Sequence, residues 1–396
     1  MEEIESKFPF TGATFDSRLV KSGMLYVALK GSRVDGNDFI PQALEKGAAM
    51  VIGGENALED LQSLAREYRR SLAPRTTVIA LTGSAGKTTT KELLRAFLSQ
   101  VGKVYATEGN NNNHLGVPIT ILNCPRDADF LILEMGSNHP GEIAALCAIA
   151  EPDVGMVTTV GSAHLEFFGS LDGVADEKGS LLAALGRNGY SAPFGVVSSD
   201  NARLGRLSEL CGVELVKAPH ECAWIAEALA EVLPGAHQVS NAARAYALAE
   251  RFGVTREQAV AALEAFDLPG SRWRHFEKDG VRYIDDSYNA NPEAMIAALD
   301  AFVRIPCDGK RVAVLGDMGE LGAQSAELHR RVFDHAMKLG IGLVIGVGEY
   351  SSNCLCHLAY KTLAPLKKKF RFDVSSGDLV LLKASHALGL SALIDR

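Results

Sequence analysis

The segment "VIALTGSAGKTTTKELL", residues 78–94, holds the residues best placed for chemistry: small residues, a lysine and a run of threonines. A loop of small residues between a buried strand and a helix lets backbone N–H groups and the helix dipole face an anion. Lys87 can then reach the β- and γ-phosphates of a nucleotide, and the hydroxyl of Thr88 can bind Mg²⁺. The segment therefore predicts a nucleotide-binding loop made of Gly83, Ser84, Ala85, Gly86, Lys87, Thr88 and Thr89.

The loop departs from the usual phosphate-loop spacing at its first position. The common pattern is Gly, four residues, then Gly-Lys-Ser/Thr, and here the first position is Leu81. We interpret Leu81 as part of the incoming strand, so that the loop is shorter at its start. An ordinary glycine-rich turn is the alternative, but the Gly-Lys-Thr-Thr-Thr run at a helix start favours nucleotide binding.

Apolar strand-like runs alternate with helix-like segments over most of the chain, which predicts α/β architecture with parallel sheets. A helix predicted to end near Pro74 and a turn-rich break at 267–274 divide the chain. We therefore expect three domains: a small N-terminal α/β domain (1–74), a central parallel-sheet domain with the phosphate loop (75–267) and a C-terminal Rossmann-like α/β domain (268–396). Strands are predicted near 24–29, 48–54, 76–83, 130–136, 154–161, 194–199, 281–287, 310–317, 341–348 and 378–385, and helices at 87–102, 240–252 and 255–266.

Composition limits the possible functions. A net charge of -8 argues against a protein that coats nucleic acid. The acidic N-terminus does not read as a signal peptide, and no apolar run approaches the length of a membrane helix. The seven cysteines are odd in number and form no C-x-x-C pair, which indicates reduced thiols in the cytoplasm.

Amide and carboxylate side chains follow the phosphate loop. Asn110, Asn112 and Asn113 lie in one segment, and their amides both donate and accept hydrogen bonds. Glu134 ends a predicted strand, where open α/β sheets place their ligands. A carboxylate near a phosphate needs a cation between them. A plain loop and a solvated glutamate are the alternatives.

These segments, with the T-G-S-A-G-K-T-T form of the loop, occur in an order that resembles the ATP-dependent Mur ligases of peptidoglycan synthesis, relatives of folylpolyglutamate synthetase. Asp16-Ser17-Arg18 and the loop 31–39, which includes Arg33, resemble the family's uridine-nucleotide-binding domain. The string "DSYNANP" at 286–292 is the most discriminating, since it resembles the branch that adds D-alanyl-D-alanine. The resemblance covers most of the chain.

The resemblance implies a role for each matching residue. Lys178 stands where the family carries a carbamylated lysine, a modification that converts the cation into a metal-binding carboxylate. The implied metal ligands are Thr88, Glu134, His164 and Lys178; the implied catalytic residues are Lys87, Glu134, His164 and Lys178; Arg272, Asn289, Asp317 and His329 would join the loop in binding ATP, and Ser17, Arg18, Asn110, Asn112 and Asn113 would bind the substrate.

The reaction implied is ligation. ATP would phosphorylate the terminal carboxylate of UDP-N-acetylmuramoyl-tripeptide, and the amine of D-alanyl-D-alanine would attack the acyl phosphate, with ATP and Mg²⁺ as cofactors. The resemblance further implies a cytoplasmic monomer that serves cell-wall synthesis, and hence cell shape and division, without nucleic acid or membrane insertion.

Two alternatives stay open: a sibling ligase that adds a single amino acid, and a catalytically impaired nucleotide-binding relative. The second alternative is based on positions where the sequence differs from the family pattern. The stretch before 234 is short, Ser180 follows Lys178-Gly179 where the family commonly has Glu, and Lys383-Ala384-Ser385-His386 replaces Lys-Gly-Ser-Arg.

Overall fold

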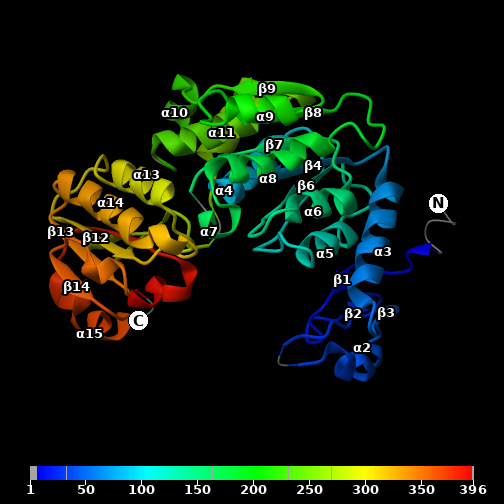
Figure 1. Cartoon of the computed structure of the whole chain (residues 1–396), viewed down its shortest axis with the longest axis horizontal. Coiled ribbons are helices and arrows are strands. Elements are labelled where there is room, and N and C mark those ends of the chain that lie inside the picture. The colour runs from blue at the N-terminus through cyan, green and yellow to red at the C-terminus, as the bar shows by residue number, and fades with distance from the viewer. Residues whose placement is uncertain (1–6, 33, 163, 231, 269, 395–396) are drawn as a thin grey trace.

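The computed structural model describes residues 7–32, 34–162, 164–230, 232–268 and 270–394, so Arg33 of the predicted uridine-binding loop lies outside the described residues. Three sheets of three, six and six strands follow one another along the chain. Figure 1 shows the C-terminal unit to the left of the central unit and the N-terminal unit below the central unit. The predicted α/β class with three units is confirmed, while the exact boundaries between them stay a prediction.

The N-terminal unit is a small parallel sheet of order β1–β2–β3, followed by the long helix α3. Leu61, Ala65, Tyr68 and Leu72 recur at spacings of three and four residues on the buried face of this helix. That face packs against α5 and α6 of the central unit, so α3 joins the two units. The elements are β1 (Ala13–Thr14), β2 (Leu25–Val27), η1 (Gly36–Phe39), α2 (Ile40–Glu45), β3 (Met50–Ile52) and α3 (Ala57–Leu72).

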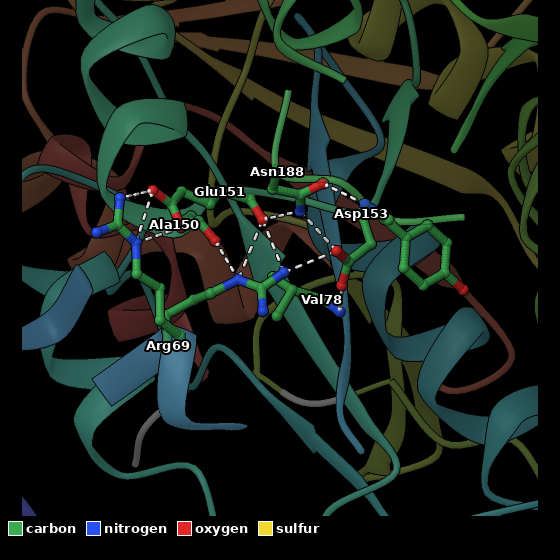
Figure 2. A network of polar contacts seen from close by, with 8 residues as sticks. Arg69, Val78, Ala150, Glu151, Asp153 and Asn188 are labelled. Carbon is green, nitrogen blue, oxygen red and sulfur yellow. Dashed lines mark hydrogen bonds and ion pairs between the residues drawn. The ribbon is translucent and has the colours of Figure 1, made fainter. Parts of the chain in front are cut away.

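A buried polar network fixes α3 to the central sheet (Figure 2). Nη2 of Arg69 lies 2.7 Å from Oδ1 of Asp153, and the two side chains are only 4 % and 6 % exposed. The guanidinium also donates to the carbonyl oxygens of Ala150 and Glu151, while Oδ2 of Asp153 accepts the N–H of Val78 in β4. Since buried charges must be paired and hydrogen-bonded, this network ties the helix to the strand that enters the phosphate loop.

The central unit is a parallel sheet of order β5–β6–β4–β7–β8–β9, so the chain enters it in the middle, at β4. Along β4, Ile79 and Leu81 pack with α4 and α11, whereas Val78 and Ala80 pack with α3, α5 and α6. A strand covered on both faces is expected to be apolar throughout, as β4 is. The elements are β4 (Thr77–Thr82), α4 (Lys87–Leu98), β5 (Val104–Ala106), α5 (Gly116–Leu122), β6 (Phe130–Glu134), α6 (Glu142–Ala150), β7 (Val154–Val157), α7 (Leu165–Phe168), α8 (Leu171–Ala184), β8 (Phe194–Ser198), α9 (Leu204–Leu210), β9 (Glu214–Ala218), α10 (Ala223–Leu229), α11 (Ala236–Ala249), η2 (Glu250–Phe252) and α12 (Arg256–Glu264).

The C-terminal unit has the sheet order β10–β11–β15–β12–β13–β14, and only the β10–β11 pairing in it is antiparallel among the described strands. Its helix α13 begins directly after the "DSYNAN" segment, with Asn291 as its N-cap. The elements are β10 (Arg274–Lys278), β11 (Val281–Asp285), α13 (Pro292–Phe302), β12 (Arg311–Gly316), η3 (Gly322–Gln324), α14 (Ser325–Lys338), β13 (Leu343–Val347), η4 (Ser351–Asn353), β14 (Leu358–Tyr360), α15 (Leu363–Asp373), β15 (Leu379–Lys383), η5 (His386–Leu388) and η6 (Leu390–Leu393).

The predicted strands and helices are found, with ends shifted by a few residues. The prediction gave no range for helices α2 and α5 to α10 or for strands β1, β5, β9, β10 and β14. In β9 only Ala218 is buried, so its sequence lacks the continuous apolar run of the inner strands. Within the described part of the chain, no helix combines the length and the apolar character that crossing a membrane requires.

Candidate functional site

The phosphate loop lies between β4 and α4, at the carboxyl edge of the central sheet. Gly83 and Gly86 have φ of 149° and 78°, in the range that favours glycine. A Cβ at Gly83 would lie 2.0 Å from Oγ1 of Thr158, and one at Gly86 would lie 2.5 Å from Oδ1 of Asn241. Both glycines are therefore required by space as well as by backbone conformation. The first N–H groups of α4 have no acceptor within the helix, which leaves them available to an anion.

A cavity of about 1050 Å³ opens beside this loop, between the central and C-terminal units. It is large enough for a nucleotide and part of a second substrate. Its lining includes these predicted site residues: Ser84, Ala85, Gly86, Lys87, Thr88, Thr89, Asn112, Asn113, Glu134, His164, Arg272 and Asn289.

Glu134 joins two of the predicted segments at the carboxyl end of β6. Its Oε2 accepts a hydrogen bond of 2.8 Å from Oγ1 of Thr88, and its Oε1 accepts one of 3.0 Å from Nδ2 of Asn112. The side chain is 3 % exposed. A buried carboxylate oxygen next to a hydroxyl oxygen suits Mg²⁺, which takes few protein ligands and completes its shell with water and phosphate oxygens.

Lys87 opens α4, and its Nζ donates to the carbonyl oxygen of Gly83 at 2.6 Å. Burial lowers the pKa of this amine, and Arg272 lowers it further, whereas Glu134 opposes the shift. The amine of Lys87 therefore lies within electrostatic reach of both Arg272 and Glu134.

Lys178, in α8, is 1 % exposed. Its Nζ donates to Oγ of Ser137 at 2.6 Å and lies 5.3 Å from the centre of the Phe168 ring. Burial and the positive charge of Lys87 lower the pKa of Lys178 to about 7, against the pull of Glu177. The lowered pKa raises the neutral fraction of the amine, and only a neutral amine can react with CO₂ to form a carbamate.

His164 has a left-handed backbone, with φ of 58°, and its Nδ1 is paired with Oε2 of Glu320 from the C-terminal unit. Burial lowers the pKa of His164, and Glu320 opposes the shift. The contacts of His164 and Lys178 thus lead to Glu320 and Ser137 rather than to Glu134. No group of three or more His, Cys, Asp or Glu side chains among the described residues is arranged to hold a metal, so the metal roles of His164 and Lys178 stay predictions.

The predicted uridine-binding residues lie in the N-terminal unit, outside the cavity lining. Arg18 is exposed, and its Nη2 pairs with Oδ2 of Asp16 at 2.7 Å, which lowers the pKa of that carboxyl to about 2. Ser17 is buried, and its carbonyl oxygen accepts from Nζ of Lys46. Asn110 is exposed at the start of the asparagine run and is likewise absent from the described lining.

Asp317 and His329, predicted to contact ATP, are engaged within the C-terminal unit. Oδ1 and Oδ2 of Asp317 accept backbone N–H groups of Glu349, Tyr350 and Ser351. His329 is fully buried, and its Nε2 accepts from the N–H of Met318. Neither residue belongs to the described cavity lining. Their role in ATP binding stays a prediction.

The C-terminal unit instead presents other groups to the cavity. The guanidinium of Arg272 lies 3.6 Å from the centre of the Tyr288 ring, and that ring lies 5.6 Å from His386. Lys383, which heads the altered Lys-Ala-Ser-His segment, is buried and pairs with Oδ2 of Asp286 at 2.6 Å. Lys383 therefore keeps a buried cation at the start of this segment, while His386 at its end is exposed.

Sequence reasoning missed Arg244 and Glu293, which both line the cavity. Arg244 is 2 % exposed, and its Nη2 donates to Oδ1 of Asn241 at 2.5 Å. That hydrogen bond orients the amide that packs on Gly86. An arginine three residues after Asn241 on a predicted helix was the only available signal. Glu293 stands directly after the "DSYNANP" string and carried no separate signal.

A phosphate loop in a parallel central sheet, with a buried carboxylate beside it and a second α/β unit facing it, defines a class: multidomain α/β proteins that use a nucleoside triphosphate. Three family models match the chain: the Mur ligase family catalytic domain at 9–88, the Mur ligase middle domain at 81–218 and the Mur ligase glutamate ligase domain at 271–386. The chain belongs to the Mur ligase family.

Individual proteins of known sequence or structure are similar to this chain over nearly its whole length. UDP-N-acetylmuramoyl-tripeptide–D-alanyl-D-alanine ligase from Escherichia coli K12 is 32 % identical, with 96 % of this chain and 92 % of the relative covered. The crystal structure of MurF from Acinetobacter baumannii superposes with a TM-score of 0.84 at 27 % identity, covering 96 % and 92 %. MurF from Thermotoga maritima, in complex with ADP, gives 0.83 at 28 %, covering 98 % and 97 %.

Proposed function

We propose that this protein is an ATP-dependent ligase that joins D-alanyl-D-alanine to UDP-N-acetylmuramoyl-tripeptide through an acyl phosphate. The observation that carries the proposal is the junction of Thr88, Asn112 and Glu134 beside the phosphate loop. Through these hydrogen bonds, Glu134 at the end of β6 connects the phosphate loop with the asparagine segment. The similar ligases from E. coli and Bacillus subtilis support the choice of substrates.

Different residues of the cavity contribute to the first step, the transfer of a phosphoryl group from ATP. Lys87 and Arg272 supply positive charge where the phosphoryl group moves from ATP to the terminal carboxylate of the tripeptide. Thr88 and Glu134 would hold Mg²⁺, which neutralises phosphate charge when bound. Asn112 and Asn113 provide amides in the lining of the same cavity, where they would bind the muramyl peptide.

The second step needs the acceptor amine close to the new acyl phosphate. The C-terminal unit brings Arg272, Tyr288 and Lys383 to the same cavity. Holding both reactants in one enclosure converts a bimolecular attack into a local one. The amine forms the peptide bond and phosphate leaves.

Lys178 fits the carbamate proposed for it. Its amine is buried and partly neutral near pH 7, and its hydrogen bond to Ser137 places it next to the loop that follows β6. A carbamate there would add a carboxylate near Lys87, whose charge already acts on Lys178. We place the protein in the cytoplasm, where these substrates are made, and expect a monomer.

The test is phosphate release from ATP with Mg²⁺ and UDP-N-acetylmuramoyl-tripeptide, with and without D-alanyl-D-alanine. Release that depends on the dipeptide supports the proposal. Release that ignores the dipeptide, or that responds instead to a single amino acid such as L-lysine, meso-diaminopimelate or D-glutamate, rejects it. ATP binding without any ligation would identify a catalytically impaired relative.

A further inference from the structure

Glu293, in the first turn of α13, is a carboxylate of the C-terminal unit that contacts the central unit beside the phosphate loop. Its Oε1 accepts a hydrogen bond of 2.6 Å from Oγ of Ser162. A Cβ built on Gly161 would lie 3.4 Å from Oε2 of Glu293. Gly161 in turn exchanges two hydrogen bonds, of 3.0 and 3.2 Å, with the hydroxyl of Ser84 in the phosphate loop. The carboxylate is therefore one residue removed from that loop.

The charge of Glu293 is not needed to anchor α13 at this place, because Asn291 already does so. The side chain of Asn291 is 7 % exposed. Its Oδ1 accepts from the N–H of Ala294 and caps the helix, while its Nδ2 donates to the carbonyl oxygen of Ser84 at 3.4 Å. The neutral amide of Asn291 thus holds the start of α13 to the phosphate loop. The presence of a carboxylate at Glu293, two residues later, therefore requires another explanation.

The surroundings of the second carboxylate oxygen of Glu293, Oε2, suggest that explanation. Oε2 is buried and has no hydrogen-bond partner within the described part of the chain. A buried charged oxygen without a donor is unfavourable, and a carboxylate near a phosphate is repelled unless a cation lies between them. The amine of Lys87 donates to the carbonyl oxygen of Gly83 and forms no ion pair with Glu293 within the described part of the chain. The cavity, which Glu293 helps to line, must receive a cation during the reaction.

Two cations enter the proposed reaction, Mg²⁺ and the ammonium group of the dipeptide. The Mg²⁺ ligands proposed above, Thr88 and Glu134, are hydrogen-bonded to each other, whereas Oε1 of Glu293 is bonded to Ser162. A single carboxylate matches a single ammonium, which can donate to Oε2 while Ser162 keeps Oε1. We propose that Glu293 binds the ammonium group of the incoming D-alanyl-D-alanine and holds its nitrogen toward the acyl phosphate.

This inference rests on the proposed function and deepens it, because it assigns a residue of the acceptor site. The test compares Glu293→Gln, Glu293→Asp and Ser162→Ala with the unaltered protein. Acyl phosphate formation is measured first, as hydroxamate formed from ATP, Mg²⁺, UDP-N-acetylmuramoyl-tripeptide and hydroxylamine without dipeptide. The KM for D-alanyl-D-alanine is then measured by phosphate release.

Glu293→Gln keeps the acceptor for Ser162 but loses the charge. It should raise the KM for the dipeptide roughly tenfold to a hundredfold, the range for a hydrogen bond to a charged group. The hydroxamate rate and the KM for ATP should not change. Glu293→Asp should recover part of the loss, and Ser162→Ala, which removes a hydrogen bond but leaves the carboxylate, should change the KM for the dipeptide by at most about fivefold.

Three results would overturn the inference. An unchanged dipeptide KM in Glu293→Gln, or an equal change in Ser162→Ala, would make Glu293 only a contact between the two units. A higher Mg²⁺ requirement for hydroxamate formation in Glu293→Gln would make it a metal ligand. If the unaltered protein forms no hydroxamate, the proposed function itself fails and the inference falls with it.

Discussion

Replacing Arg69 with methionine tests whether the buried network of Figure 2 holds α3 to the central sheet. The change removes the ion pair with Asp153 and three hydrogen bonds to the carbonyl oxygens of Ala150 and Glu151. Breaking a buried ion pair by removing one partner costs about 3–5 kcal/mol, because the remaining charge is left buried.

The expected magnitude lies at the lower end of that range. Asp153 keeps two donors, the N–H of Val78 at 2.7 Å and Nδ2 of Asn188 at 2.6 Å, so its charge is not fully exposed to the apolar interior. We therefore expect a loss of about 3 kcal/mol. For a unit of this size that loss lowers Tm by roughly 6–12 °C.

The measurement is differential scanning calorimetry, with the transitions compared one by one because a multidomain chain does not melt in a single step. Arg70→Met is the matched control: Arg70 is the next residue on the same helix, and its ion pair with Glu151 is at the surface, where such pairs contribute little. The reasoning is wrong if Arg69→Met and Arg70→Met lower Tm equally. It is also wrong if Arg69→Met and Asp153→Asn are additive in the double variant, since partners in one network should couple.

Three further predictions concern the site. Lys87→Ala should lower phosphate release at least about 10²- to 10³-fold with an unchanged melting curve, since one charge on the transferring phosphoryl is lost; a smaller loss would contradict its assigned place. Unaltered protein in ¹³C-bicarbonate should show a carbamate NMR signal that grows between pH 6 and 8, because the pKa of Lys178 is lowered to about 7 and its neutral fraction rises across that window; Lys178→Met should lack the signal, and its persistence would place the carbamate elsewhere. Gly86→Ala should raise the KM for ATP roughly tenfold or more, since its Cβ would lie 2.5 Å from Oδ1 of Asn241; Asn241→Ala in the same chain should recover part of the loss, and a neutral Gly86→Ala would refute the packing argument.

Features that depend on neighbours along the chain could be predicted from the sequence. The phosphate loop is one such feature, because glycine favours the positive φ that Gly83 and Gly86 adopt in it. The start of α12 is another: Thr255 and Gln258 form the capping box that their spacing predicts, with Oγ1 of Thr255 accepting from the N–H of Gln258. Such local rules need no knowledge of the fold.

Contacts between distant segments could not be predicted in this way. Arg69 and Asp153 are 84 residues apart, and Ser162 and Glu293 are 131 apart. A charged residue on a predicted helix reads as a solvated one unless the packing of that helix is known. The same limit applies to His164, whose type and place were noted but whose pairing with Glu320 depends on how the C-terminal unit meets the central one.

The G-x-G turn at 346–348 shows how packing decides between two interpretations of one pattern. A glycine turn after a parallel strand can bind phosphate through its N–H groups, and Gly348 has the required left-handed backbone, with φ of 125°. Here the three N–H groups that follow donate to the carboxylate of Asp317 instead. A Cβ at Gly348 would lie 2.3 Å from Cγ of Asp317, so the glycine exists to let this carboxylate approach. The carboxylate of Asp317 therefore occupies the anion site that the N–H groups of this turn form.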